Sequence, residues 1–136
     1  MRQYVLDANA VIRYLSGGPG EEKVTALMRR AAKGDARLCI SVINWGEAMY
    51  SLAKSVGLSK AAKDLRILSS VVESVAADET QAEMAATLKF RYKMGYADAY
   101  AAALALHTGA TLVTADPDFA KLGKQLKVLA LPRYAR

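Results

Sequence analysis

The sequence predicts an α/β protein with three layers, in which a mainly parallel central sheet of four to five strands is flanked by helices. Three observations support this fold class. Short apolar runs of strand length recur along the chain, segments with apolar residues at helical spacing separate them, and no two runs are joined by a two-residue turn. A helical segment between two strands is long enough to cross back over the sheet, so neighbouring strands are expected to run parallel.

The first half of the chain predicts two strands and four helices. The strands are short apolar runs, at 4–6 and 38–42. The helices have apolar residues at helical spacing, and glycines follow three of them as breakers or stops. They are predicted at 8–15, 21–33, 44–57 and from 59 through 68.

The second half predicts three more strands, separated by two helices and an irregular segment. Strands are expected at about 74–77, at 111–114 and at about 127–131. Helices are expected at 79–93, before Gly95, and at 98–108, before Gly109. We find no repeat, low-complexity tract or linker, so residues 1–136 are expected to form a single domain.

Composition narrows the expected environment and partners. With 136 residues and 53% apolar residues, the chain can bury one core. Its formal charge of +6 and pI of about 9.5 favour a polyanion such as nucleic acid as partner. Cys39 is the single cysteine and lies in an apolar run, which indicates a small buried side chain, no disulfide and a reducing compartment. Since no apolar run is long enough to span a membrane, we expect a cytoplasmic protein that makes no membrane contact.

Acidic residues stand where the predicted strands and loops lead into helices. Asp7 and Asp116 follow apolar strands, and ligands of parallel sheets bind beyond the carboxyl ends of strands. Helix capping explains Asp7 and Asp116 equally well, and Asp116 precedes Pro117. For Glu47 and Asp98, each taken alone, capping is the favoured interpretation, since Asp98 opens a predicted helix. Glu47 stands three residues after Asn44, the spacing of a capping box.

Taken together, the four acids indicate a metal site. Carboxylates gathered on one side of a sheet repel one another unless a cation lies between them. Mg²⁺ prefers oxygen ligands and is commonly held by a few carboxylates, several waters and substrate phosphates. With one cysteine and one histidine, the chain offers no soft alternative site.

Four segments of the chain resemble the PIN-domain nucleases, and most closely the VapC-type toxins of bacterial toxin–antitoxin pairs. They are Tyr-Val-Leu-Asp7-Ala-Asn9, Ser41-Val-Ile-Asn-Trp-Gly-Glu47, Tyr96-Ala-Asp98-Ala and Leu-Val-Thr114-Ala-Asp116-Pro-Asp118-Phe. The resemblance covers essentially the whole chain and implies a PIN-like fold. The chain departs from many relatives at Ala8, where they have Thr.

The resemblance implies a Mg²⁺-dependent endoribonuclease, with Mn²⁺ as an alternative ion, that hydrolyses RNA phosphodiester bonds by metal-activated water. It implies catalytic roles for Asp7, Glu47, Asp98 and Asp116, and metal ligation by Asp7, Asp98 and Asp116. Supporting roles fall to Asn9, Thr114 and Asp118. The implied partners are an RNA substrate, a cognate antitoxin and a second copy of the chain.

Asp78 also follows a predicted strand, but the family motif gives it no role, and its spacing from Gln81 fits a capping box.

Basic residues and aromatic rings offer candidate RNA contacts. A solvated face is the favoured interpretation of each single cation, and packing in the core or in a dimer is the favoured interpretation of the rings. The cations are Lys89, Arg91, Lys93, Lys121, Lys124 and Lys127, and the rings are those of Trp45, Tyr92, Tyr96 and Tyr100. Two alternatives to a toxin remain open: a PIN-fold nuclease without an antitoxin, acting in RNA processing or on DNA, and a non-catalytic nucleic-acid-binding module.

Overall fold

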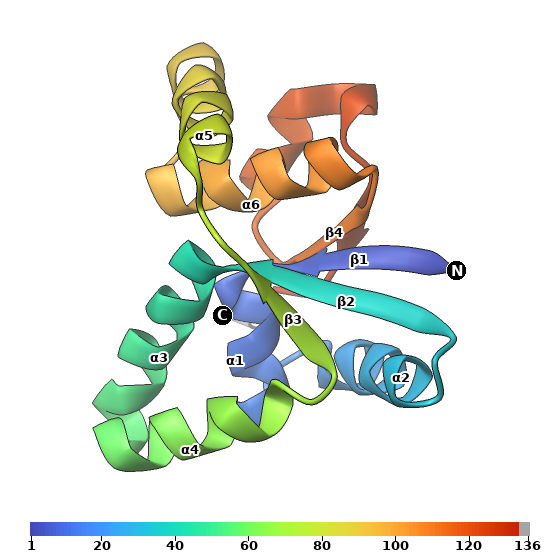
Figure 1. The fold of residues 1–136 in the computed structure, drawn as a ribbon, viewed down its shortest axis with the longest axis vertical. Helices are drawn as coiled ribbons and strands as arrows, with labels where there is room; N and C mark the ends of the chain where they lie inside the picture. Colours follow the sequence, from blue (N-terminus) through green and yellow to red (C-terminus); the bar gives the residue numbers. More distant parts are fainter. Residues whose placement is uncertain (134–136) are drawn as a thin grey trace.

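The computed structural model describes residues 1–133 as a five-stranded sheet between two layers of helices (Figure 1). The strands are β1 (Arg2–Leu6), β2 (Ala36–Ser41), β3 (Val72–Val75), β4 (Thr111–Thr114) and β5 (Val128–Ala130). The helices are α1 (Ala8–Ser16), α2 (Glu21–Ala32), α3 (Val42–Val56), α4 (Leu58–Leu68), α5 (Glu79–Tyr92), α6 (Tyr96–Thr108) and the 3₁₀ helix η1 (Pro117–Gln125). Within residues 1–133, no helix is long and apolar enough to cross a membrane.

All five strands run parallel, in the order β3-β2-β1-β4-β5. The predicted fold class is therefore confirmed. The chain starts in the middle of the sheet, builds outward through β2 and β3, then returns to the other side of β1 with β4 and β5. This reversal places a topological switch point between β1 and β4, where open parallel sheets bind ligands.

The sheet is buried on both faces, which explains why its strands are continuous apolar runs rather than alternating ones. Tyr4 and Leu6 pack on the side of α1, α2, α3 and α4. Val5, between them in sequence, packs on the side of α5, α6 and η1. Successive strand residues point to opposite faces, so the central strand β1 contributes to both core layers.

Several predicted element ends are wrong by about two residues. β1, β2 and α6 each begin two residues earlier than predicted, at Arg2, Ala36 and Tyr96. α3 begins at Val42, because Ser41 caps it by accepting a hydrogen bond from the Ile43 amide at 3.2 Å. β3 ends at Val75 rather than at residue 77, because it pairs with β2 only from Val72 to Val75.

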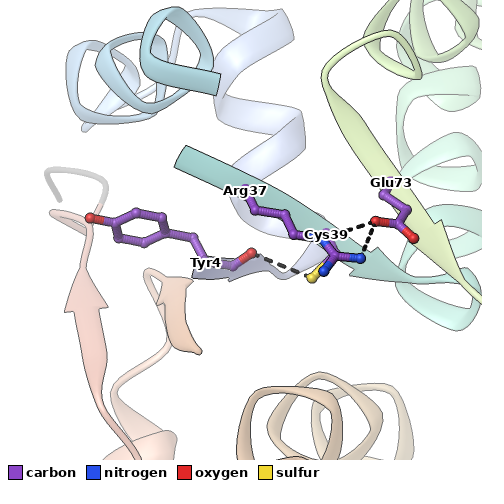
Figure 2. Close-up of polar contacts among 4 residues, drawn as sticks. All are labelled: Tyr4, Arg37, Cys39 and Glu73. Carbon is purple, nitrogen blue, oxygen red and sulfur yellow. Dashed lines mark hydrogen bonds and ion pairs between the residues drawn. The ribbon is translucent and has the colours of Figure 1, made fainter. Parts of the chain in front are cut away.

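Cys39 is the small buried side chain that the sequence predicts, on the β2 strand shown in Figure 2. Its Sγ lies 3.6 Å from the Tyr4 carbonyl oxygen, and burial raises the pKa of the thiol, so it stays protonated at neutral pH. In the same view, Arg37 on β2 forms an ion pair with Glu73 on β3 at 2.8 Å. Both partners are exposed, so this pair contributes little stability.

Candidate active site

The four predicted acids line one hollow at the carboxyl edge of the sheet. Its volume is about 230 Å³, and it lies beside the switch point between β1 and β4. Asp7 follows β1, Glu47 lies on α3, Asp98 on α6 and Asp116 just after β4. The remaining lining residues are Ala8, Asn9, Ile12 and Ser51.

Asp7 is both a helix cap and the most deeply buried acid of the hollow, with 4% of its surface exposed. Its Oδ1 accepts a hydrogen bond from the Ala10 amide at 2.9 Å, which caps α1. Its Oδ2 accepts one from the Thr114 hydroxyl at 2.5 Å. The two interpretations of Asp7 are thus compatible, because one oxygen caps the helix while the other is held beside β4.

Thr114 connects Asp7 to Asp116. Its Oγ1 accepts a hydrogen bond from the Asp116 amide at 3.0 Å while donating to Asp7. Asp116 caps η1 as predicted, because its Oδ1 accepts from the Asp118 amide at 2.9 Å with Pro117 at the start of the helix. Asp118 contributes this backbone amide, but its exposed side chain is not among those lining the hollow.

The capping box predicted for Glu47 is wrong. Ser41 caps α3, and the structure gives α3 no acid in its first turn. Glu47 lies in the next turn, where its exposed carboxylate has no hydrogen bond or ion pair with any residue between 1 and 133. The capping interpretation therefore no longer applies to Glu47. Ser51, one helical turn further on, also lines the hollow and was missed, although its spacing of four from Glu47 places it on the same helix face.

Asp98 is likewise not the helix cap that the sequence suggests. Gly95 caps α6, and Asp98 is the third residue of the helix. Its carboxylate is half-buried and lines the hollow together with those of Asp7, Glu47 and Asp116.

Asn44 ties together the helices that carry Glu47 and Asp98, a role that sequence reasoning missed. Its side chain is fully buried, and its Nδ2 donates to the Ala97 carbonyl oxygen at 3.0 Å. Ala97 directly precedes Asp98, and Asn44 lies three residues before Glu47. The Oδ1 of Asn44 has no partner within the described chain.

Burial and mutual repulsion make the charged form of the cluster costly. Burial is the largest cause that raises the pKa of Asp7 to about 6, opposed by its hydrogen bonds from Thr114 and Ala10. Burial also raises the pKa of Asp98 to about 6, followed by the charges of Asp116, Asp7 and Glu47. A cation in the hollow would relieve both effects.

The donors around the hollow fit a hard divalent cation. They are carboxylate, amide and hydroxyl oxygens, with no sulfur or imidazole among them. In residues 1–133, no three acidic, histidine or cysteine side chains converge closely enough to ligate one ion directly. Mg²⁺ keeps several of its waters, so carboxylates at this spacing suit an ion held partly through water.

The predicted RNA-contact residues are spread over the surface around α5, α6 and η1. Every candidate lysine and arginine is exposed. Tyr96 stacks on Tyr100 with ring centroids 5.3 Å apart, and the Tyr92 hydroxyl accepts a hydrogen bond from Gln125 at 2.6 Å. Trp45, on α3, is partly buried and packs against the core on the side of α1 to α4.

Comparison with known proteins gives one family and a consistent fold. The family model described as the PIN domain matches residues 4–125. No match was found among curated protein sequences.

The structure resembles solved toxin–antitoxin structures over nearly its full length. A Rickettsia felis VapBC2 complex, bound to a DNA fragment from its promoter, shares 22% identity at a TM-score of 0.77, covering 95% of this chain and 98% of that chain. A toxin–antitoxin complex from Klebsiella pneumoniae shares 25% identity at 0.66, covering 93% and 96%. Mycobacterium tuberculosis VapC20, described as a sarcin–ricin loop cleaving toxin, shares 21% identity at 0.69, covering 88% and 95%.

Proposed function

The chain belongs to the PIN-domain family over residues 4–125, and from this premise we propose that it is a metal-dependent endoribonuclease and the toxin of a toxin–antitoxin pair. One observation carries the catalytic part of the proposal. Four acids from four separate elements line a single hollow at the switch point of the sheet. Two of these acids, Glu47 and Asp98, have no helix-capping role that would explain their presence.

In this proposal Asp7, Asp98 and Asp116 hold Mg²⁺ or Mn²⁺, and Glu47 completes the catalytic acids. The bound cation would supply a Lewis acid that activates water and offsets charge on the phosphodiester being cut. Thr114 holds Asp7 in place by its hydroxyl and fixes the backbone of Asp116. Asn9 offers a neutral amide at the rim of the hollow, and Asp118 stabilises the position of Asp116.

The proposed partners follow from the structural relatives. The Rickettsia felis and Klebsiella pneumoniae relatives are toxin–antitoxin complexes, and VapC20 is described as cleaving the sarcin–ricin loop. By analogy, this chain would cut RNA, bind a cognate antitoxin and form a homodimer. Since its substrate would be cellular RNA, its site of action would be the cytoplasm.

The deciding experiment incubates purified protein with total RNA, with Mg²⁺ or with EDTA, and compares Asp7→Asn with the parent. Asn still caps a helix but removes the charge, so the variant should fold and lose cleavage. Asp78→Asn is the matched control. Asp78 caps α5 by accepting a hydrogen bond from the Gln81 amide at 2.8 Å, as Asp7 caps α1 through the Ala10 amide, and it does not line the hollow. Cleavage by Asp7→Asn at the parent rate would refute the catalytic assignment.

The toxin assignment needs a separate test in cells. Expression of the parent should arrest bacterial growth, and both Asp7→Asn and co-expression of the neighbouring gene should relieve the arrest. RNA cleavage in vitro without arrest would indicate a nuclease that has no antitoxin. RNA binding without cleavage would indicate a non-catalytic module.

A further inference from the structure

A second hollow lies where the end of α5 meets the start of α6. Its volume is about 450 Å³, and Ala86, Lys89, Phe90, Lys93 and Tyr96 line it; we call it the α5–α6 hollow. The Phe90 ring is 86% exposed, the largest fraction among the exposed large hydrophobic residues of the described chain. A single exposed apolar residue is ordinary, but an aromatic ring between two lysines in a concave site is the arrangement that binds unpaired bases.

Lys93 occupies a backbone position that favours glycine. With φ of 52° and ψ of 40°, it ends α5 in the left-handed region, where a side chain costs free energy that glycine does not. It is the only non-glycine residue of the described chain with positive φ, and glycines fill the corresponding position after α1 and α6. No hydrogen bond or ion pair engages its ammonium group within residues 1–133. Within the described residues, the Lys93 ammonium group is therefore available to a ligand.

The α5–α6 hollow adjoins the acidic hollow. Tyr96, in its lining, is two residues before Asp98 and stacks on Tyr100. Gly95, directly before Tyr96, lies close to the carboxylate of Asp98, because a Cβ built on it would be 3.6 Å from Asp98 Oδ2. An RNA strand with its scissile phosphate at the acids would thus have a neighbouring nucleotide within reach of Phe90 and Lys93.

We propose that the α5–α6 hollow binds an unpaired nucleotide of the RNA substrate beside the phosphate to be cut. Its base would lie against the Phe90 ring, and its phosphate would meet Lys93. Base-paired RNA would not fit, since its bases are already stacked and turned inward. This inference rests on the proposed ribonuclease function and adds a nucleotide-binding site at Phe90 and Lys93.

A second copy of the chain is the competing occupant. Glu79 and Glu83 precede Phe90 along the exposed side of α5, so a copy related by two-fold symmetry would bring acids toward lysines. Two features favour RNA. The hollow lies at the start of α6, the helix that carries Asp98, and the net charge of +6 attracts a polyanion.

The test measures binding of a fluorescent single-stranded RNA oligonucleotide and its duplex to the full chain carrying Asp7→Asn, which prevents cleavage. Adding Phe90→Ala should weaken single-strand binding about tenfold and leave duplex binding unchanged. Adding Lys93→Gly should weaken binding and lower the slope of log K against log salt by about 0.7, the value for one lost phosphate contact. The same Lys93→Gly change should leave the melting temperature equal or higher, because glycine relieves the left-handed backbone.

Two controls keep the outcomes distinct. Lys33→Gly removes a lysine that also ends a helix, at α2, and Ile67→Ala removes an exposed apolar side chain on α4; neither should change RNA binding. Unchanged single-strand binding in both test variants would overturn the proposal, as would conversion of a dimer to a monomer by Phe90→Ala without loss of RNA affinity. If the parent protein cleaves RNA in either case, the ribonuclease function stands and the α5–α6 hollow alone is wrongly assigned.

Discussion

Thr114 is the residue on which the geometry of the acids depends most. Its hydroxyl donates to one acid and accepts from the backbone of another, so two segments far apart in sequence meet at a single oxygen atom. Groups that orient metal-binding carboxylates commonly affect activity about 10- to 100-fold when they are removed. Thr114 therefore tests whether the arrangement of the acids matters in addition to their charge.

We expect Thr114→Val to lower the cleavage rate by at least about tenfold, because valine keeps the shape but leaves the buried Asp7 oxygen without its donor. Thr114→Ser keeps the hydroxyl and should retain most of the activity. Steady-state cleavage of a defined RNA by parent, Val and Ser variants provides the measurement. Equal loss in the Ser and Val variants would show that the methyl group matters instead of the hydrogen bond.

At the residue scale, the sequence predicted which acids would gather but not what each one does locally. Asp7 and Asp116 follow strands directly, so the positions of the strands place them at the sheet edge. Glu47 and Asp98 were wrongly given capping roles because each true cap stands three residues before the predicted one: Ser41 before Asn44, and Gly95 before Asp98. Local propensity cannot distinguish between two capping residues one turn apart.

At the scale of elements, the tie between α3 and α6 sets the separation of Glu47 from Asp98. Asn44 alone provides a hydrogen bond between these helices within the described chain, and it was invisible in the sequence because its partner is a backbone carbonyl 53 residues away. The strands were easier to predict. β4 matches the predicted range, since its apolar run ends at the polar pair Thr114 and Asp116.

We expect Asn44→Leu to weaken Mg²⁺ binding while changing the free energy of unfolding by no more than about 1 kcal/mol. Leucine removes the hydrogen bond to Ala97, but it also removes the buried oxygen that has no partner, and the two effects on stability oppose each other. Calorimetric titration with Mg²⁺ and urea denaturation measure the two quantities separately. Parent-like Mg²⁺ affinity would mean that core packing alone holds α3 and α6 at the required separation.

At the scale of the whole molecule, the acid cluster links stability to pH and to metal. Asp7 and Asp98 have pKa values of about 6 in the folded protein, above their ordinary value of 3.8. The folded state therefore binds more protons than the unfolded state between these values. The stability that protonation of Asp7 and Asp98 contributes to the folded state is present at low pH and is lost as the pH rises through about 6.

Without metal, the protein should melt at a higher temperature at pH 5 than at pH 8, by about 5 °C. Mg²⁺ binds the ionised acids, so it should raise the melting temperature more at pH 8 than at pH 5. Thermal scans with Mg²⁺ or EDTA at the two pH values test both statements. In Asp7→Asn the difference in melting temperature between pH 5 and pH 8 should be smaller, because one of the two titrating groups is gone. An unchanged difference would mean that other groups cause it.

The pairing of β1 with β4 also determines when activity can first arise during synthesis. Asp7 leaves the ribosome early, whereas Thr114, which orients it, is 107 residues later in the chain. Until β4 and Asp116 have emerged from the ribosome, β1 cannot pair with β4. Asp7 then lacks both Thr114 and Asp116 beside it. If the chain has the proposed ribonuclease function, a nascent chain would therefore be inactive toward the ribosome and messenger that produce it, and so would a product truncated before residue 114.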